Sequence, residues 1–401
     1  MTEEERSPQT MRDLVLRLGL DPRDVDRATA DGTLGLLAVS SFIFPEQPIY
    51  TQAEAIEMSG LGDNVSRYWR ALGFPDPLPD EKAFSQADID VLKVVKQLVE
   101  IGLVEEDVAL QMGRVIGVSM ARIAAAQIDA IEARVDEVGP DAMWGPSNEG
   151  TDPAVLRAGM LQTTMPQILE YAWRRHMQVA AYRRMIRDSA ALDGESSGLA
   201  VGFADLVGFT SLSQQLDDHA LAHVVERFEQ TAYDIVGAHG GRVVKMIGDE
   251  VMYDATDAGV AVRIGLALAD AYHADDAMSD VRVGIAFGPV LEREGDLFGP
   301  TVNLASRIVG IAYEGSVVVG PSVHDALADD PALRWKQLRS RHLKHIGRVQ
   351  LWTVRAADDS FDGEGGEERA WRRRGQILDR VAELVDRIVE PTAAEGEEEE
   401  E

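Results

Sequence analysis

The sequence contains no cysteine among its 401 residues. Disulfides, thiolate zinc sites and cysteine nucleophiles are therefore excluded, and any metal must be held by oxygen or histidine ligands. Oxygen ligands suit hard cations, so Mg²⁺ or Mn²⁺ is the expected metal if one is bound.

Long hydrophobic runs and positive charge are also scarce. No stretch approaches the ~20 uninterrupted apolar residues of a membrane span, and the first residues, MTEEERSPQT, are acidic and polar, unlike a signal peptide. These features predict a cytoplasmic protein with no membrane partner. The formal net charge of −30 disfavours non-specific binding to nucleic acid or anionic membranes. With 45% hydrophobic residues, the chain can still fill the cores of two or three domains.

The chain divides into a helical first half and a mixed second half. Residues 1–150 are dominated by helical periodicity and short turn signals, which predict an all-α domain. Glycine, proline and acids then mark a hinge, and residues 151–198 are expected to hold this hinge and a linker helix from about Pro166 to Ser189.

The second half alternates apolar strand-like runs with amphipathic helical segments over residues 199–356, which predicts an α+β or α/β domain. Residues 357–401 are expected to form a linker, one amphipathic helix and an acidic tail.

The segment FADLVGFT places Asp205 at the end of a predicted strand, ahead of a glycine-containing turn. Backbone amides of the turn, at Phe209 and Thr210, can meet phosphate oxygens while Asp205 holds a cation that bridges them. A strand-end aspartate that only caps the following turn is the structural alternative. The pattern therefore indicates a phosphate and metal site only if a second ligand lies nearby.

The segment KMIGDE supplies such a ligand. Gly248 permits a tight hairpin that exposes Asp249 between two predicted strands. Two carboxylates on adjacent strands suit a two-metal site for Mg²⁺ or Mn²⁺ bound to a nucleoside triphosphate. Asp205 and Asp249 are therefore the candidate metal ligands.

Three segments, FADLVGFT, KMIGDE and DLFGPTVNLASR, occur in this order and resemble the catalytic domain of class III adenylyl cyclases over residues 199–356. The resemblance implies a ferredoxin-like α+β fold, ATP as substrate, and two metal ions per site at Asp205 and Asp249. It also implies that Lys245 and Asp296 select adenine. A lysine that donates to a ring nitrogen and an aspartate that accepts from the exocyclic amine would reject guanine, which reverses both polarities.

The same resemblance implies that Asn303 and Arg307 stabilise the transition state and that Lys344 holds the triphosphate. The pattern around Lys344 departs from the family's glycine-rich version, so Arg348 or His345 could take its place. The permanently charged guanidinium of Arg307 can stabilise the negative charge that develops at the α-phosphoryl group. Family sites lie between two catalytic domains, so a homodimer would contain two composite sites and the monomer would be inactive.

In the first half, residues 48–103 resemble the winged helix-turn-helix of MerR-type regulators. Acidic residues outnumber basic ones there, which argues against DNA binding. The segment is expected to be a helical regulatory module, similar to the N-terminal halves of autoinhibited, pH-responsive mycobacterial cyclases. Its effector could be protons, a fatty acid or a protein partner.

The predicted linker helix carries His176 within a largely apolar stripe. Its members at helical spacing are Leu169, Trp173, His176, Val179, Ala180 and Arg183. His176 is either a packing residue or a pH switch, since a histidine pKa of ~6.5 lies closest to neutral pH. If an inhibited state buries it in the neutral form, acidification should activate the protein.

Two other functions are compatible with parts of the pattern. The GDE hairpin also occurs in diguanylate cyclases, but NLASR and Asp296 argue against that activity. A catalytically degenerate nucleotide-binding or DNA-binding regulator is the non-enzymatic alternative, and it is disfavoured because no expected catalytic position is lost.

Overall fold

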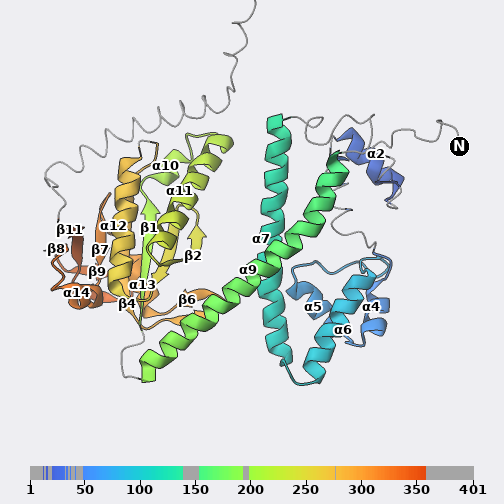
Figure 1. Ribbon diagram of the computed structural model, residues 1–401, viewed down its shortest axis with the longest axis horizontal. Helices are drawn as coiled ribbons and strands as arrows, with labels where there is room; N and C mark the ends of the chain where they lie inside the picture. Colours follow the sequence, from blue (N-terminus) through green and yellow to red (C-terminus); the bar gives the residue numbers. More distant parts are fainter. Residues whose placement is uncertain are drawn as a thin grey trace, which may run out of the picture. The chain divides into compact units, whose positions relative to one another are not determined.

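The computed structural model describes residues 20–31, 48–138, 153–192 and 198–357, apart from Asp276 and with a few isolated positions before residue 42 in addition. The chain forms two compact units, Met1–Ala181 and Tyr182–Glu401. Figure 1 shows a helical part and a part built on a sheet, as the sequence predicts. The predicted acidic tail and its helix lie outside the described residues.

The first unit is helical. Its helices are α2 (Pro22–Ala30), α4 (Gln52–Ser59), α5 (Asn64–Ala71), α6 (Gln86–Glu100), α7 (Glu106–Val138) and most of α9 (Pro153–Leu192). Helix α6 begins at a capping box, in which the Ser85 side chain accepts a hydrogen bond from the amide of Asp88. The α-helical fold class of this half is therefore confirmed.

The segment predicted to be MerR-like has its own small core. Helices α4, α5 and α6 and the start of α7 pack around Val65, Phe84 and Ile89, which are fully buried. An isolated bridge between Tyr50 and Phe84 closes the segment. These contacts make residues 50–110 a compact helical module.

Helix α7 contains a stretch, Glu106–Ala130, that is long and apolar enough to cross a membrane by length and composition, at a mean hydropathy of 1.2. It is the one stretch of this kind in the part of the chain that the structure describes. Several of its large apolar side chains are exposed, among them Met112 and Val118. Length and composition alone are weak grounds for a membrane span.

The linker helix is longer than the sequence predicts. Helix α9 begins at Pro153 rather than near Pro166, and Pro166 lies inside it. The intervening residues include two each of Ala, Leu and Met, which are good helix formers. A single internal proline removes one backbone hydrogen bond, which a long helix can tolerate.

The second unit is an α+β domain whose elements follow one another closely. They are β1 (Leu199–Leu206), α10 (Phe209–Leu212), α11 (Asp218–Ala238), β2 (Arg242–Ile247), β3 (Glu250–Ala255), α12 (Ala258–Ala274), β4 (Val281–Gly288), β5 (Leu291–Arg293), β6 (Asp296–Phe298), α13 (Pro300–Val309), β7 (Val317–Val319), α14 (Pro321–Leu327), β8 (Leu333–Gln337), β9 (Arg341–Leu343), β10 (Gly347–Val349) and β11 (Trp352–Ala356).

The seven-stranded sheet has the order β2-β3-β1-β4-β7-β11-β8. Its first four strands with α11 and α12 make a β-α-β-β-α-β unit, in which β1 pairs antiparallel with β3 and β4. This is the ferredoxin-like arrangement. Helices α11 and α12 lie side by side on one face of the sheet (Figure 1).

Helix α13 covers part of the opposite face. Alternate residues of β1 point to the two faces, so Ala200 and Ala204 join the core under α11 and α12, while Val201 and Phe203 pack with Ala305 of α13. The close approach of α13 needs a glycine, because a Cβ at Gly284 of β4 would lie 2.3 Å from the backbone nitrogen of Val309.

Candidate active site

Strand register gathers charged residues on the face of the sheet that α13 partly covers. In an antiparallel pair, directly opposed residues project to the same face. Asp205 of β1 opposes Glu250 of β3 on one side and Arg282 of β4 on the other. Phe203, two residues before Asp205, packs with α13, so these three charged residues belong to the same face.

Asp205 is held by an arginine. The Nε and Nη2 atoms of Arg282 both lie 2.5 Å from Oδ2 of Asp205, whose side chain is only 13% exposed. Burial raises the pKa of Asp205, Arg282 lowers it, and the nearby charge of Asp249 raises it further. The net shift is upward, so desolvation outweighs the arginine.

The predicted hairpin between Lys245 and Glu250 is confirmed. Gly248 adopts φ 64°, a left-handed conformation that glycine favours, and Asp249 follows it in the turn. The amide of Leu206 donates to the backbone carbonyl of Asp249 over 3.0 Å, which ties the turn to the end of β1. The two motifs that supply Asp205 and Asp249 are therefore adjacent, as the sequence predicts.

Glu250 is a third acid, close enough to Asp205 and Asp249 for their charges to act on it. Burial, followed by the charges of Asp205 and Asp249, raises the pKa of Glu250 to about 7, and Arg282 offsets this only in part. Carboxylates that raise one another's pKa in a half-buried site gain from a divalent cation. The donor set is all oxygen, which fits Mg²⁺ or Mn²⁺.

Within the described residues, no three His, Asp or Glu side chains form a ready-made metal cluster. Two carboxylates with nucleotide phosphates and water are a usual ligand set for Mg²⁺, which seldom occupies an all-protein cage. Asp205 and Asp249 thus fit metal ions that arrive with a nucleotide. The number of ions stays a prediction.

The structure brings Lys245 and Asp296 together across 51 positions of the sequence. The Nζ atom of Lys245 in β2 donates to Oδ2 of Asp296 at 2.5 Å, and the other carboxylate oxygen accepts the amide of Leu297. Both side chains are partly exposed. The ammonium donor and carboxylate acceptor therefore stand next to each other, where they could read two atoms of one base.

Asn303 and Arg307 lie one turn apart on α13, and both are exposed. Their helix is anchored by the buried residues Ala305, Ile308 and Val309. Among the described residues, neither side chain makes a hydrogen bond or ion pair with Asp205 or Asp249. One chain thus presents these two residues outward, away from its core.

The remaining predicted substrate contacts lie on turns. Lys344 is exposed in the turn between β9 and β10, beside His345 at φ 66°. Phe209 and Thr210 begin α10 directly after the glycine turn, close in sequence to Asp205. Their roles toward a triphosphate stay predictions.

His176 is exposed on α9, and the neighbouring Trp173 is 62% exposed. Burial of a neutral His176, on which the predicted pH switch depends, is therefore not seen in the described part of α9. The switch stays a prediction.

Sequence reasoning missed Arg282 and left Glu250 without a role. A basic residue at the start of the otherwise apolar run VRVGIAFG is a usable signal, because a charge on a buried strand usually has a partner. The adjacent acids of GDE are a second signal, since neighbouring carboxylates raise one another's pKa.

Comparisons with known proteins match both halves of the chain. Residues 194–356 match the adenylate and guanylate cyclase catalytic domain, and residues 6–143 match the adenylate cyclase regulatory domain. An adenylate cyclase of Streptomyces coelicolor is 40% identical over 292 residues, which cover 73% of this chain and 75% of the relative.

A pH-sensitive adenylate cyclase of Mycobacterium tuberculosis is 30% identical over 360 residues, covering 88% of each chain. The crystal structure of the adenylyl cyclase CyaB from P. aeruginosa covers 42% of this chain and 97% of its own, at 23% identity and a TM-score of 0.35. The Streptomyces and Mycobacterium relatives match over most of their length, and the two halves of the chain match two domains of adenylate cyclases. The chain therefore belongs to the adenylate cyclase family, with a regulatory domain ahead of its catalytic domain.

Proposed function

We propose that the protein converts ATP to 3′,5′-cyclic AMP and pyrophosphate. The ribose 3′-oxygen forms a bond to the α-phosphorus, the bond from that phosphorus to the bridging oxygen of the β-phosphate breaks, and the hydroxyl proton is released. Pyrophosphate leaves with the electron pair of the broken bond. The observation that carries this assignment is the contact of Lys245 with Asp296 in a catalytic domain of the cyclase family.

Lys245 and Asp296 would read the adenine. The ammonium donates to a ring nitrogen, and the carboxylate accepts from the exocyclic amine. Guanine offers a carbonyl and a ring N–H at the corresponding positions, so the pair selects against it. The 2.5 Å contact supports this role because it holds both side chains in place before substrate binds.

Asp205 and Asp249 would hold the divalent cations that accompany the triphosphate. Such ions lower the pKa of the attacking hydroxyl and neutralise charge on the leaving phosphates. Arg282 keeps one oxygen of Asp205 fixed by two hydrogen-bond donors. The turn at Gly248 presents Asp249 beside it.

We infer that the active site is shared between two copies of the chain. Asn303 and Arg307 are exposed on α13 and make no contact with the carboxylates of their own chain within the described residues. In a head-to-tail homodimer, Arg307 of one copy would meet the α-phosphoryl group held at Asp205 of the other, with Asn303 orienting the ribose. Lys344 would hold the triphosphate, and Phe209 and Thr210 would offer backbone amides to it.

The N-terminal domain would regulate this reaction in a cytoplasmic enzyme. Its match to an adenylate cyclase regulatory domain supports a regulatory role, and the chemistry of its effector, whether proton, lipid or protein, is open to direct screening. The acidic balance of the chain continues to argue against DNA as a partner.

The deciding experiment incubates the purified full chain with Mn²⁺ and either ATP or GTP and identifies the products by mass spectrometry. Cyclic AMP from ATP, with little cyclic GMP from GTP, is the expected result. A linear or cyclic dinucleotide would support the diguanylate cyclase alternative. Nucleotide binding without any product from a dimeric, folded protein would favour the degenerate regulator. An Asp249→Asn variant shows whether the product depends on the proposed site.

A further inference from the structure

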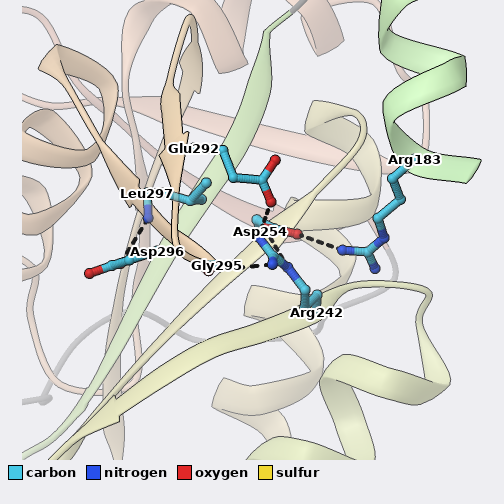
Figure 2. A network of polar contacts seen from close by, with 7 residues as sticks. All are labelled: Arg183, Arg242, Asp254, Glu292, Gly295, Asp296 and Leu297. Atoms are coloured by element: carbon cyan, nitrogen blue, oxygen red, sulfur yellow. Dashed lines mark hydrogen bonds and ion pairs between the residues drawn. The ribbon is translucent and has the colours of Figure 1, made fainter. Parts of the chain in front are cut away.

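Arg242, at the start of β2, is held by a buried acid. Its Nε atom lies 2.9 Å from Oδ2 of Asp254 in β3, and its Nη2 atom donates to the same oxygen. The Asp254 side chain is only 5% exposed. A carboxylate buried to this extent needs its cationic partners, so the guanidinium of Arg242 has a fixed position (Figure 2).

A bulge directs Arg242 toward the base-reading residues. Arg242 opposes Asp254 and Lys245 opposes Met252, with the register shifting between Val243 and Lys245. Asp254 and Met252 are two residues apart on β3 and so share a face. The extra residue in β2 therefore places Arg242 on the same face as Lys245, although a regular strand would separate residues three apart onto opposite faces.

The β5–β6 hairpin lies against this face and receives the other donors of Arg242. The Nη1 atom donates to the backbone carbonyl of Gly295 over 3.4 Å, and Nη2 lies 3.5 Å from Oε1 of Glu292 (Figure 2). Gly295 immediately precedes Asp296, and Glu292 is on the paired strand. One guanidinium thus contacts the first strand and the turn of the hairpin, beside the base-reading acid.

The hairpin needs such ties. Each of its strands has three residues, and two of its apolar side chains, Leu291 and Phe298, are 62% and 47% exposed. An isolated two-stranded hairpin is marginally stable at best. Besides Arg242, the buried Leu297 and the Lys245–Asp296 pair hold it to the sheet.

We propose that Arg242 is a positioning residue for base selection: anchored on Asp254, it fixes the Gly295 carbonyl and Glu292 so that Asp296 meets Lys245 in the geometry that favours adenine. This inference rests on the proposed role of Lys245 and Asp296. Arg242 does not touch the nucleotide in this scheme, and it acts through the hairpin.

The chain offers a matched control at the same carboxylate. Arg183 of α9 places Nη1 3.6 Å from Oδ1 of Asp254 and makes no contact with the hairpin among the interactions drawn in Figure 2. Arg183→Gln therefore removes one guanidinium from Asp254 and leaves the ties between Arg242 and the hairpin intact. Arg242→Gln and Glu292→Gln remove those ties.

The experiment measures kcat and KM of the full chain for ATP and for GTP with Mn²⁺, alongside melting temperatures. We expect Arg242→Gln to lower the ATP-to-GTP ratio of kcat/KM about tenfold, mainly through a higher KM for ATP, since a small displacement of a contacting group has effects of this size or larger. Glu292→Gln should shift the ratio in the same direction by less. Arg183→Gln should keep the wild-type ratio, and Arg242→Lys should restore part of it.

Wild-type selectivity in folded Arg242→Gln and Glu292→Gln would overturn the inference, and so would an equal loss in Arg183→Gln. If Arg242→Gln does not fold, the double variant Arg242→Gln/Asp254→Asn, which avoids an uncompensated buried charge, and Glu292→Gln decide the matter. Asp296→Ala tests the proposed base-reading pair separately from the positioning role of Arg242. If it leaves selectivity unchanged, the proposed base-reading pair itself is wrong.

Discussion

Arg282 places its Nε and Nη2 atoms 2.5 Å from a single oxygen of Asp205, the carboxylate that we propose as a metal ligand. The arginine therefore compensates a buried acid before any cation binds, and its contact leaves the second oxygen, Oδ1, to other partners. A cation that binds Asp205 would further neutralise a carboxylate whose negative charge Arg282 already compensates in part.

This pair predicts a stability effect that a metal can mask. Arg282→Gln should lower the free energy of unfolding by about 1–2 kcal/mol in EDTA, a value reduced from that of a fully buried pair because Arg282 is 37% exposed. Urea denaturation measures it. Asp205→Asn/Arg282→Gln should recover most of the loss, and Mn²⁺ should recover part of it in the single variant only. A double variant as unstable as Arg282→Gln would contradict this account.

Glu250 predicts a pH dependence of stability when divalent metal is removed. Its pKa is raised from 4.5 to about 7, so between these values the folded chain keeps a proton that the unfolded chain has lost. Its contribution to stability is therefore greatest at low pH and falls as pH rises toward about 7. In EDTA, Glu250→Gln should become more stable than wild type on going from pH ~5 to pH ~8, the range that spans this titration.

The melting temperatures of both proteins across this range measure the effect. Glu226→Gln, an exposed change on α11, provides the matched control and should follow the wild-type curve. Parallel curves for wild type and Glu250→Gln would show that Glu250 is ionised in the folded protein throughout.

The base-reading pair predicts loss of ATP selectivity when its two residues are replaced. Lys245→Glu/Asp296→Cys removes both adenine contacts and offers guanine partners, so kcat/KM for ATP should fall by roughly 100-fold or more. Activity toward GTP gains less, because the shape of the pocket must also adapt. Steady-state rates with both nucleotides test this. Survival of ATP turnover in the folded double variant would exclude Lys245 and Asp296 as the specificity pair.

A shared site predicts complementation. Asp205→Ala and Arg307→Ala should each be inactive, and an equal mixture should regain roughly a quarter of wild-type activity, because half of the dimers are mixed and one of their two sites is intact. Size-exclusion chromatography and native mass spectrometry establish subunit exchange. Exchange without recovered activity would argue against a site built from two copies.

Much of the catalytic domain could be predicted from its sequence. FADLVGFT and KMIGDE each combine a strand run with a glycine turn, so their carboxylates could be placed at strand ends, and the structure puts the two turns next to each other. Lys245 and Asp296 are 51 positions apart, and only the family resemblance paired them before the structure did. Local pattern alone carries no such long-range information.

Other features depend on tertiary contacts that no local pattern encodes. The three-residue strands of the β5–β6 hairpin are too short to show periodicity. The partner of Arg282 follows from the register between β1 and β4, which the sequence of either strand leaves open. The early start of α9 was hidden because Pro166 resembles a helix start, while the helix continues through it.

The bulge in β2 interrupts, at Val244, the alternation of side chains between the two faces of the sheet. Before the bulge, Arg242 faces Asp254, and Val243 packs against the core beneath α11 and α12. Loss of Val244 would leave the other pairs of β2 and β3 in a regular ladder, in which Arg242 and Lys245 are two positions apart and still share a face. What Val244 supplies is an apolar side chain packed against the cluster beneath α13, so deleting it should lower stability without turning the guanidinium of Arg242 toward the core beneath α11 and α12.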